Sequence, residues 1–480
     1  MPELAWTVLA PALIVAGTAL VVLCIDILRP VNRGLVAAWV AVAGTVAALI
    51  ASVMLWEQQA YGMDGMLFLD KFALFFNAIF LIGTGLTIFV STGYLHREGS
   101  GRSEYYLLIL AATAGMMLMA AGADLIVIFL GLELMSISLY ILVGFLRERK
   151  TSNEASMKYL LLGAFATGFL LYGIALIYGA VGTTNLREIE LALSRGEING
   201  SLLLLGGMVL LMVGFAFKVA AVPFHMWAPD VYEGAPTAIT AFISAGPKAA
   251  AFAAFLRVLM LSMKPLQAEW TAALWVLAVL TMTVGNLGAL SQRSIKRMLA
   301  YSSIAHAGYV LVALTAASEK GVAAALFYLL AYTFMNIGAF AIVILMGRKG
   351  EENLDIAGYA GLGFRHPGLG LAMGLFMVSL AGLPPTAGFF GKFSIFSAAV
   401  ESGYVGLTII GVLNSLVSVY FYLGVVVNMY MTRPTDEQRV TFMPLPTRAA
   451  LLIASAATLY MGLAPSALLR LARETVVSLM

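Results

Sequence analysis

The chain has 480 residues, of which 61% are apolar and 11% are charged, and its net charge is +3. Soluble globular proteins are about 45–50% apolar and about 25% charged, so the composition excludes a soluble enzyme and a disordered chain. The small net charge excludes a nucleic-acid partner. The single cysteine, Cys24, excludes an internal disulfide and a cysteine-held cluster. We therefore predict an all-α polytopic membrane protein.

About 14 apolar segments are long enough to cross a bilayer as helices, since a spanning helix needs about 20 residues. They lack the alternation typical of barrel strands, and lipid offers the backbone no hydrogen-bonding partner, so each segment is expected to be helical. The N-terminus lacks the basic segment of a cleavable signal, so the first span is expected to be retained. The predicted spans are 6–25, 35–56, 72–90, 105–120, 125–146, 159–180, 202–222, 238–261, 274–290, 298–314, 322–346, 369–383, 405–429 and 449–469.

Basic residues concentrate in alternate loops, and the positive-inside rule places such loops in the cytoplasm. Both termini are then expected on the non-cytoplasmic side, unless a span is miscounted by one. The opposite loops hold fewer basic residues, chiefly Arg187, Arg195, Lys264 and Lys320. The basic loops carry Arg29, Arg33, Arg97, Arg102, Arg147, Arg149, Lys150, Arg293, Lys296, Arg297, Arg348, Lys349, Arg433 and Arg439.

Ionisable residues inside predicted spans are informative, because each costs about 2.5 kcal/mol or more there unless it is paired or hydrated. Glu133 lies near the middle of span 125–146 and is too short to reach the interface. It is either part of a proton path or a structural carboxyl bonded to a neighbouring helix. Lys218 lies in a long apolar run interrupted by Pro223, which places it inside the membrane. The alternative is that its ammonium extends to the interface.

Two further lysines follow prolines inside apolar stretches. Lys248 directly follows Pro247 near mid-depth, and we expect a helix break there whose freed carbonyls line a polar cavity. Lys392 follows two prolines in the apolar stretch 369–400, which is too long for one straight span. A broken helix that carries Lys392 at its interruption fits this length better than a loop.

Three residues are candidate auxiliaries. Lys158 lies near the predicted cytoplasmic end of its span, where it either extends to the interface or takes part in proton transfer. His225 and His306 can pass protons because imidazole titrates near neutral pH, although a single histidine is as often a hydrogen-bonded interface residue. The adjacent pair Asp70 and Lys71, at the head of the third span, is expected at the membrane interface.

One carboxylate and several buried lysines together predict a proton relay. A proton cannot cross hydrocarbon, so it moves between titratable side chains bridged by water. A glutamate about 4 Å from a lysine strengthens the lysine's hold on its proton by about 4 kcal/mol, and such groups titrate as a coupled set. The chain shows no haem or metal signature, no dinucleotide fingerprint and no Walker loop. The energy for transport is therefore expected from an ion gradient or a partner.

Five stretches resemble the antiporter-like membrane subunits of proton-pumping NADH-quinone oxidoreductase, respiratory complex I. These subunits are related to subunits of multisubunit cation/proton antiporters. The matching stretches are 131–135, 155–164, 218–237, 294–309 and 383–393. Within the family, the chain lacks the long lateral C-terminal helix of the largest subunit. It also has lysine at 248 and 392, where other members carry histidine or glutamate.

The resemblance implies two inverted five-helix repeats, at 105–262 and 271–431, with broken helices in the seventh and twelfth spans. A three-helix segment, 1–95, precedes the repeats, and a C-terminal helix, 447–480, follows them. The resemblance also implies that Glu133 and Lys218 form a coupling ion pair, that Lys248 is the central relay and that Lys392 is the terminal group. It makes Lys158 and His306 auxiliary groups, and His225 is a further auxiliary candidate.

The family binds NADH, flavin, iron–sulfur clusters and quinone in other subunits, so no cofactor is expected in this chain. The expected partners are other membrane and peripheral subunits, including neighbouring antiporter-like subunits, in a bacterial inner membrane. Three alternatives remain open: a cation/proton antiporter subunit, a subunit of an oxidoreductase fed by another donor, and a scaffold whose lysines are relics. The shortage of carboxylates in the spans argues against cation exchange, and the cost of buried charges argues against a scaffold.

Overall fold

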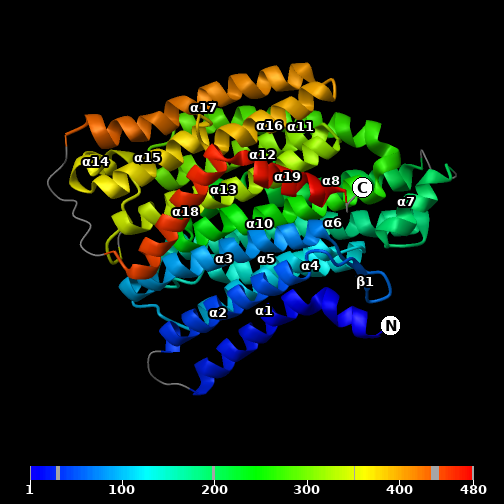
Figure 1. Cartoon of the computed structure of the whole chain (residues 1–480), viewed down its shortest axis with the longest axis horizontal. Coiled ribbons are helices and arrows are strands. Elements are labelled where there is room, and N and C mark those ends of the chain that lie inside the picture. The colour runs from blue at the N-terminus through cyan, green and yellow to red at the C-terminus, as the bar shows by residue number, and fades with distance from the viewer. Residues whose placement is uncertain (1, 29–32, 197–200, 351, 434–442, 478–480) are drawn as a thin grey trace.

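The computed structural model describes residues 2–28, 33–196, 201–350, 352–433 and 443–477, and these form a helical bundle (Figure 1). A two-stranded antiparallel hairpin, β1 (Ala60–Gly62) and β2 (Leu67–Leu69), was not predicted. Strands of three residues are too short to show an alternating pattern in the sequence. The predicted all-α polytopic class is otherwise confirmed.

The helices follow the predicted spans closely. Three short helical elements that are not α-helices, η1 (Val258–Ser262), η2 (Lys264–Leu266) and η3 (Ile356–Tyr359), join some of them. The α-helices are α1 (Pro2–Leu28), α2 (Arg33–Met54), α3 (Lys71–Glu98), α4 (Glu104–Ala121), α5 (Leu125–Val143), α6 (Lys150–Val181), α7 (Leu186–Ser194), α8 (Leu202–Val219), α9 (Trp227–Gly234), α10 (Thr237–Arg257), α11 (Gln267–Leu290), α12 (Ile295–Thr315), α13 (Glu319–Met346), α14 (Leu362–Arg365), α15 (Pro367–Ala381), α16 (Ala387–Glu401), α17 (Val405–Met431), α18 (Leu445–Leu463) and α19 (Pro465–Val476).

The number of spans is slightly lower than predicted when each helix is judged by itself. Among the described residues, 12 helices are long and apolar enough to cross a membrane. The count is 13 if α18 and α19, which meet at a bend of 87°, are taken as one span. The remaining predicted span is α15, an apolar helix of 15 residues that is too short to cross alone.

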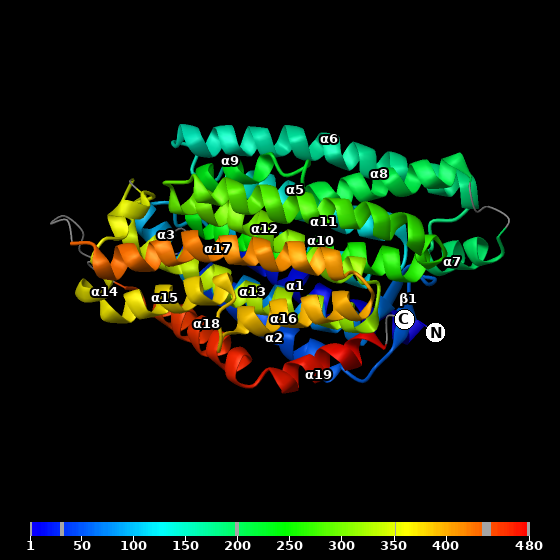
Figure 2. The ribbon, with the colours of Figure 1, turned by 90° about the horizontal axis from the view of Figure 1, so that it is seen from above.

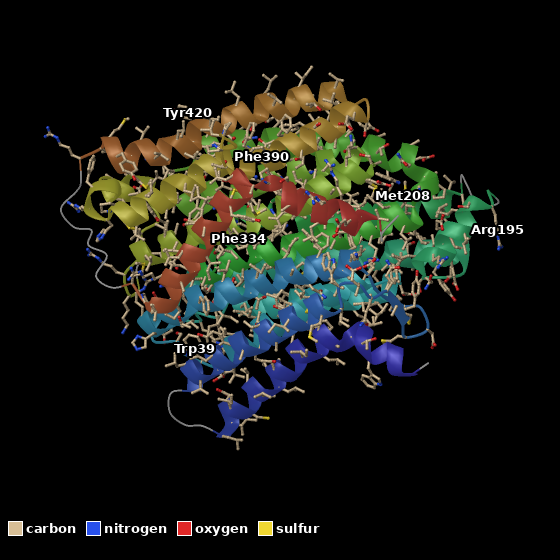
Figure 3. All side chains as sticks on the ribbon, in the orientation of Figure 1. Trp39, Arg195, Met208, Phe334, Phe390 and Tyr420 are labelled. Atoms are coloured by element: carbon tan, nitrogen blue, oxygen red, sulfur yellow. The ribbon has the colours of Figure 1, made fainter. Side chains whose placement is uncertain are left out.

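The centre of the bundle is formed by α10 and α13, whose most apolar segments are completely buried, whereas only 28% of such a segment is buried in α1 and in α17. Figure 2 shows α6 at one edge of the molecule and α18 with α19 at the other. Figure 3 shows Phe334 of α13 within the bundle and Tyr420 of α17 on its outside, where it is 76% exposed. The outer apolar faces are those expected to meet lipid or a partner.

Glycines let the helices around this centre approach closely. A Cβ atom on Gly115 of α4 would lie 2.6 Å from the carbonyl oxygen of Gly131 in α5, and a Cβ on Gly131 would lie 2.8 Å from the carbonyl oxygen of Gly115. Small residues serve this purpose in membrane bundles because packing, rather than hydrophobic burial, drives association there. This contact fixes α5, which carries Glu133, against α4.

Two spans are broken, as predicted. The first half of one span, α8, ends at Val219, Ala220 adopts a left-handed conformation with φ 59°, and the chain becomes helical again in α9. The first half of the other, α15, ends at Ala381, Gly382 has φ 86°, and α16 continues after Thr386. Both breaks free backbone carbonyls inside the bundle, which neighbouring protein groups must satisfy.

The break predicted at Lys248 is wrong, because α10 runs without interruption through Pro247. A proline inside a helix removes one backbone donor, and in a fully buried helix the surrounding protein can compensate for this loss. Lys248 therefore projects from the side of a continuous helix and not from a gap in it.

The basic loops gather at one end of the molecule, as their alternation predicted. Arg149 lies 2.7 Å from Glu98 and 3.1 Å from Glu352, and Lys296 lies 2.9 Å from Glu352, so four of these loops are joined by ion pairs. The beginning of α1 and the end of α19 lie at the opposite end, beside β1 (Figure 2). Two of the predicted basic residues, Arg29 and Arg439, lie outside the described residues.

Candidate functional site

Lys218 lies in the last turn of α8, just before the break, and is only 5% exposed. Its Nζ donates a hydrogen bond to Ser136 Oγ at 2.7 Å and to Tyr140 Oη at 3.4 Å. Both partners belong to α5 and lie about one turn apart, which places the ammonium against one face of that helix. The alternative in which the Lys218 side chain extends to the interface is excluded.

Glu133 lies three residues before Ser136 on α5 and is half-buried. One carboxylate oxygen, Oε1, is buried without a hydrogen-bond partner. Both Glu133 and Lys218 are among the described residues, and they form no ion pair with each other; the ammonium donates to Ser136 and Tyr140. The structure therefore brings the two predicted partners to the same region of α5 without direct contact.

Lys248 lies midway along α10 and is 3% exposed. Its Nζ donates to Ser303 Oγ at 2.5 Å and to the Ser303 carbonyl oxygen at 2.9 Å, both on α12. The Ser303 hydroxyl also lies 3.1 Å from Tyr232 Oη of the half-helix α9. The polar environment expected for Lys248 exists, but α12 and α9 provide it.

His306 lies one turn beyond Ser303 on α12 and is buried between two tyrosines. Its Nδ1 lies 2.5 Å from Tyr328 Oη, and its Nε2 lies 2.9 Å from Tyr422 Oη. The Tyr422 hydroxyl also forms a hydrogen bond with Ser302. A neutral imidazole has one N–H donor and one acceptor, so this arrangement can carry a proton from one tyrosine hydroxyl to the other.

Lys392 lies in α16, is 4% exposed and reaches back across the break to the end of α15. Its Nζ donates to the carbonyl oxygens of Leu380 at 3.1 Å and Ala381 at 2.9 Å, and to Ser415 Oγ of α17 at 2.9 Å. The last carbonyls of a helix have no partner within it and carry partial negative charge, so an ammonium is stabilised there. The predicted position of Lys392 at the interruption is confirmed.

A series of aromatic ring contacts runs from Tyr140, which is bonded to Lys218, to Tyr232, which is bonded to the Ser303 hydroxyl beside Lys248. The Tyr140 and Tyr159 ring centroids are 4.9 Å apart, those of Tyr159 and Trp227 are 4.7 Å apart, and those of Trp227 and Tyr232 are 6.3 Å apart. We call these four residues the aromatic layer. Among the described residues, no chain of side-chain hydrogen bonds crosses it, so the two lysines belong to separate polar clusters.

Lys158 and His225 lie apart from the buried lysines. The side chain of Lys158 is 43% exposed and forms ion pairs of 2.8 Å with Glu154 and with Asp230. Asp230 also pairs with Arg297 at 2.9 Å. His225 lies in the segment between α8 and α9, is half-buried, and has no hydrogen-bond partner at its buried Nδ1.

A buried charge cluster at the basic end was not predicted. Glu352 accepts hydrogen bonds from Tyr94 Oη at 2.8 Å, from Arg149 at 3.1 Å and from Lys296 at 2.9 Å. Burial by itself would raise the pKa of Glu352, but the Lys296 ammonium, these hydrogen bonds and Arg149 lower it to about 2. Nothing in the sequence distinguished this glutamate from the other charges of the loop that follows α13.

A second unpredicted pair lies at the opposite end. Arg257 of α10 and Asp70, which caps α3, are both fully buried and are joined by two hydrogen bonds of 3.0 and 2.8 Å. Arg257 also donates to the Ala120 carbonyl oxygen at 2.9 Å, and its guanidinium lies 4.8 Å from the centre of the Phe72 ring. The burial of Asp70 was not predicted, and its expected position at the membrane interface remains a prediction. An arginine inside an apolar span was the available signal, although its partner is 187 residues away.

Within the described residues, no group of three or more His, Cys, Asp or Glu side chains could hold a metal ion. The architecture defines a class of membrane protein: a helical bundle with two broken spans and, among its described residues, three buried lysines that form no ion pair.

The chain belongs to the NADH:quinone oxidoreductase/Mrp antiporter transmembrane family, whose pattern matches residues 122–418. It is 52% identical over 470 residues to a protein of Trichlorobacter lovleyi named NADH-quinone oxidoreductase subunit N, covering 98% of this chain and 96% of that protein. It is 46% identical to one of the proteins named subunit N in Roseiflexus castenholzii, covering 99% of this chain and 97% of the relative. The predicted family is confirmed.

Solved structures share the fold. A chain of respiratory complex I from Thermus thermophilus is 36% identical and superposes with a TM-score of 0.83, covering 96% of this chain and 99% of the other. A chain of the Mrp complex from Dietzia sp. gives a TM-score of 0.87 at 22% identity, with 98% and 97% covered, and this similarity concerns the fold alone.

Proposed function

We propose that this chain is the N-type, proton-translocating membrane subunit of a bacterial NADH-quinone oxidoreductase. The observation that carries the proposal is the environment of Lys218, Lys248 and Lys392. Each is at most 5% exposed, and each donates only to hydroxyl or carbonyl oxygens. An ammonium without an anionic partner is costly in such an interior, and releasing the proton removes that cost. Groups of this kind can exchange protons.

The proposed path runs from Lys218 to Lys392 through the centre of the bundle. Lys248 and Ser303 form its middle, and His306, one turn further along α12, continues it between Tyr328 and Tyr422. The aromatic layer separates the Lys218 cluster from this central section, so transfer between them requires water or a ring movement.

Glu133 is the proposed electrostatic control of Lys218. The unpartnered Oε1 of Glu133 lies on the same helix as Ser136, to which the ammonium is bound. If the carboxylate and the ammonium come together, at about 4 Å they attract each other by about 4 kcal/mol, and separation would favour release of the proton. Lys158 and His225 are proposed auxiliaries near the cytoplasmic entrance.

The inverted repeats 105–262 and 271–431 remain part of this proposal. The two broken spans support them, since both have a left-handed residue directly after the first half-helix and both have a lysine near the break. Segments 1–95 and 447–480 would flank the repeats. The charge bias supports a cytoplasmic position for the basic end, which places both termini on the non-cytoplasmic side of the inner membrane.

We assign the redox chemistry to other subunits. In this assignment NADH, flavin, iron–sulfur clusters and quinone bind elsewhere, and this chain contacts neighbouring membrane subunits, including antiporter-like ones. The relatives at 46–52% identity, which are named subunit N, favour this over cation exchange. The likeness to the Mrp chain concerns the fold and gives no separate support for exchange.

The test is Lys218→Ala in the complete complex in membrane vesicles, with NADH-driven quinone reduction and proton uptake recorded together. We expect both to fall while the complex still assembles, because the relay loses the group that receives the proton beside Glu133. Lys264→Ala is the matched control, since Lys264 is an exposed lysine outside the path. Wild-type rates of both processes in Lys218→Ala would contradict the relay.

A further inference from the structure

A cavity of about 490 Å³ opens between α4, α5 and α6 at the basic end of the bundle. It is separate from the buried lysines. Its polar lining includes Arg102, Glu104 and Arg147, which lie in the loops or first turn at that end. Both arginines are exposed, and neither forms an ion pair with a described residue. Two unpaired guanidinium groups beside one cavity favour an anionic group such as a phosphate diester.

The Glu104 carboxylate, which lines the same cavity, further restricts the class of ligand. Glu104 is half-buried, and its Oε2 is buried without a hydrogen-bond partner. A buried acceptor that no protein group satisfies calls for a donor from the occupant. The occupant must therefore present a phosphate to the arginines and an N–H donor, preferably cationic, to Glu104.

The lining changes from polar to apolar with depth. Leu108 lies one turn deeper in α4 than Glu104. Ile141, in the last turn of α5, lies about one turn deeper than Phe145, which follows the end of that helix. On α6, Met157 and Leu160 follow the polar first turn and are 57% and 43% exposed, on the outside of the bundle. This order, with charge at the end of the helices and exposed apolar side chains below it, matches a headgroup followed by an acyl chain.

We propose that this cavity binds phosphatidylethanolamine from the surrounding leaflet. Its phosphate lies between Arg102 and Arg147, its ammonium donates to Glu104, and one acyl chain lies along Ile141, Met157 and Leu160. Phosphatidylcholine also has a phosphate, but its quaternary ammonium has no N–H to donate. Phosphatidylglycerol has no cation to balance the carboxylate.

The test uses the complete complex in phosphatidylcholine nanodiscs that contain a trace of a lipid with a photoactivatable acyl chain. The headgroup of that lipid is ethanolamine, choline or glycerol in three parallel samples. After illumination, lipid adducts on residues 141–160 are mapped by mass spectrometry. We expect the ethanolamine lipid to give about tenfold more adducts there than either of the other two.

Substitutions of the residues proposed to contact the headgroup show whether the labelling depends on this cavity. Arg102→Ala/Arg147→Ala is expected to lower the ethanolamine adducts about tenfold. Arg293→Ala/Arg433→Ala, which removes two exposed arginines of the same end outside the cavity, should leave them unchanged. Glu104→Gln, which is nearly isosteric, should bring the ethanolamine-to-choline ratio close to one.

Three results would overturn the proposal. One is wild-type labelling in the double arginine variant. Another is equal or stronger labelling by the glycerol lipid, which would indicate a simple anion site. The third is the absence of any adduct on residues 141–160 in the wild-type complex, which would mean that another subunit covers the cavity.

Discussion

Lys248 and Glu352 show two ways in which single charged residues are held in this bundle. Lys248 donates to the hydroxyl and carbonyl oxygens of one serine, whereas Glu352 has two cationic partners and a tyrosine. The first arrangement leaves the charge uncompensated and suits proton exchange. The second compensates the charge and suits structural support, because removing one member leaves the others buried and unpaired.

At this scale we predict that Glu352→Gln lowers the free energy of unfolding by about 3 kcal/mol near neutral pH. The ordinary pKa of this carboxyl is 4.5, and in the fold it is about 2, so its contribution is complete above pH 4.5 and disappears as the pH falls toward 2. Unfolding of the detergent-solubilised wild type and variant, followed by circular dichroism between pH 7 and pH 2.5, checks the prediction. The difference in stability between the two proteins should be about 3 kcal/mol at pH 7 and should shrink toward pH 2.5.

The control for this prediction is Glu401→Gln, which breaks the exposed pair with Lys320 and should change stability little. If Glu352→Gln kept the wild-type pH dependence, the ion pairs around Glu352 would not be the source of the stability.

At the scale of the element, the helix breaks were predictable and the helix partners were not. Prolines in an apolar run too long for one span indicated the break after α15, and the family resemblance implied the break after α8. A proline also precedes Lys248, yet α10 is continuous and completely buried, and a proline alone did not distinguish this case from the two breaks. The partners Ser136 and Ser303 come from helices distant in the sequence, and no local pattern identifies them.

The approach of α4 to α5 gives a prediction at the same scale. Gly115→Ala should destabilise the protein by about 1–3 kcal/mol, because the added Cβ would lie 2.6 Å from the Gly131 carbonyl oxygen and neither backbone can easily move. Gly168→Ala in α6 is the matched control, since nothing lies within 4 Å of the added atom. Both variants can be compared by unfolding in mixed micelles of rising SDS content. Equal stability of the two would show that the α4–α5 contact is not tight.

At the scale of the whole molecule, the bundle is tied together by charges at both ends. The Glu352 cluster joins loops at the basic end, and Asp70 with Arg257 joins α3 to the central helix α10 at the other. The class of protein and the positions of the spans followed from hydropathy alone. These ties could not be predicted, because pairing depends on which helices become neighbours.

The Asp70–Arg257 pair leads to a prediction for the molecule as a whole. Asp70→Asn leaves the buried Arg257 guanidinium without a carboxylate, and Arg257→Met leaves the buried Asp70 carboxylate without a cation. Each variant should therefore lose about 3–5 kcal/mol of stability. The double variant should recover most of this loss, because no uncompensated charge remains and the asparagine can still cap α3. Thermal unfolding of the four proteins in detergent measures the coupling. Additive losses would contradict a direct interaction between the two side chains.

The aromatic layer bears on how the membrane keeps the energy stored in its electrical potential. A potential of about 100 mV stores about 2.3 kcal/mol for each proton held on the outer side. A continuous wire of hydrogen bonds through this subunit would short-circuit that store whenever electron transfer stopped. In the proposed path, the four rings of the aromatic layer lie where such a wire would otherwise join the Lys218 and Lys248 clusters. If the relay operates as proposed, protons cross this section only while water enters or a ring moves, and the layer then protects the stored potential when electron transfer stops.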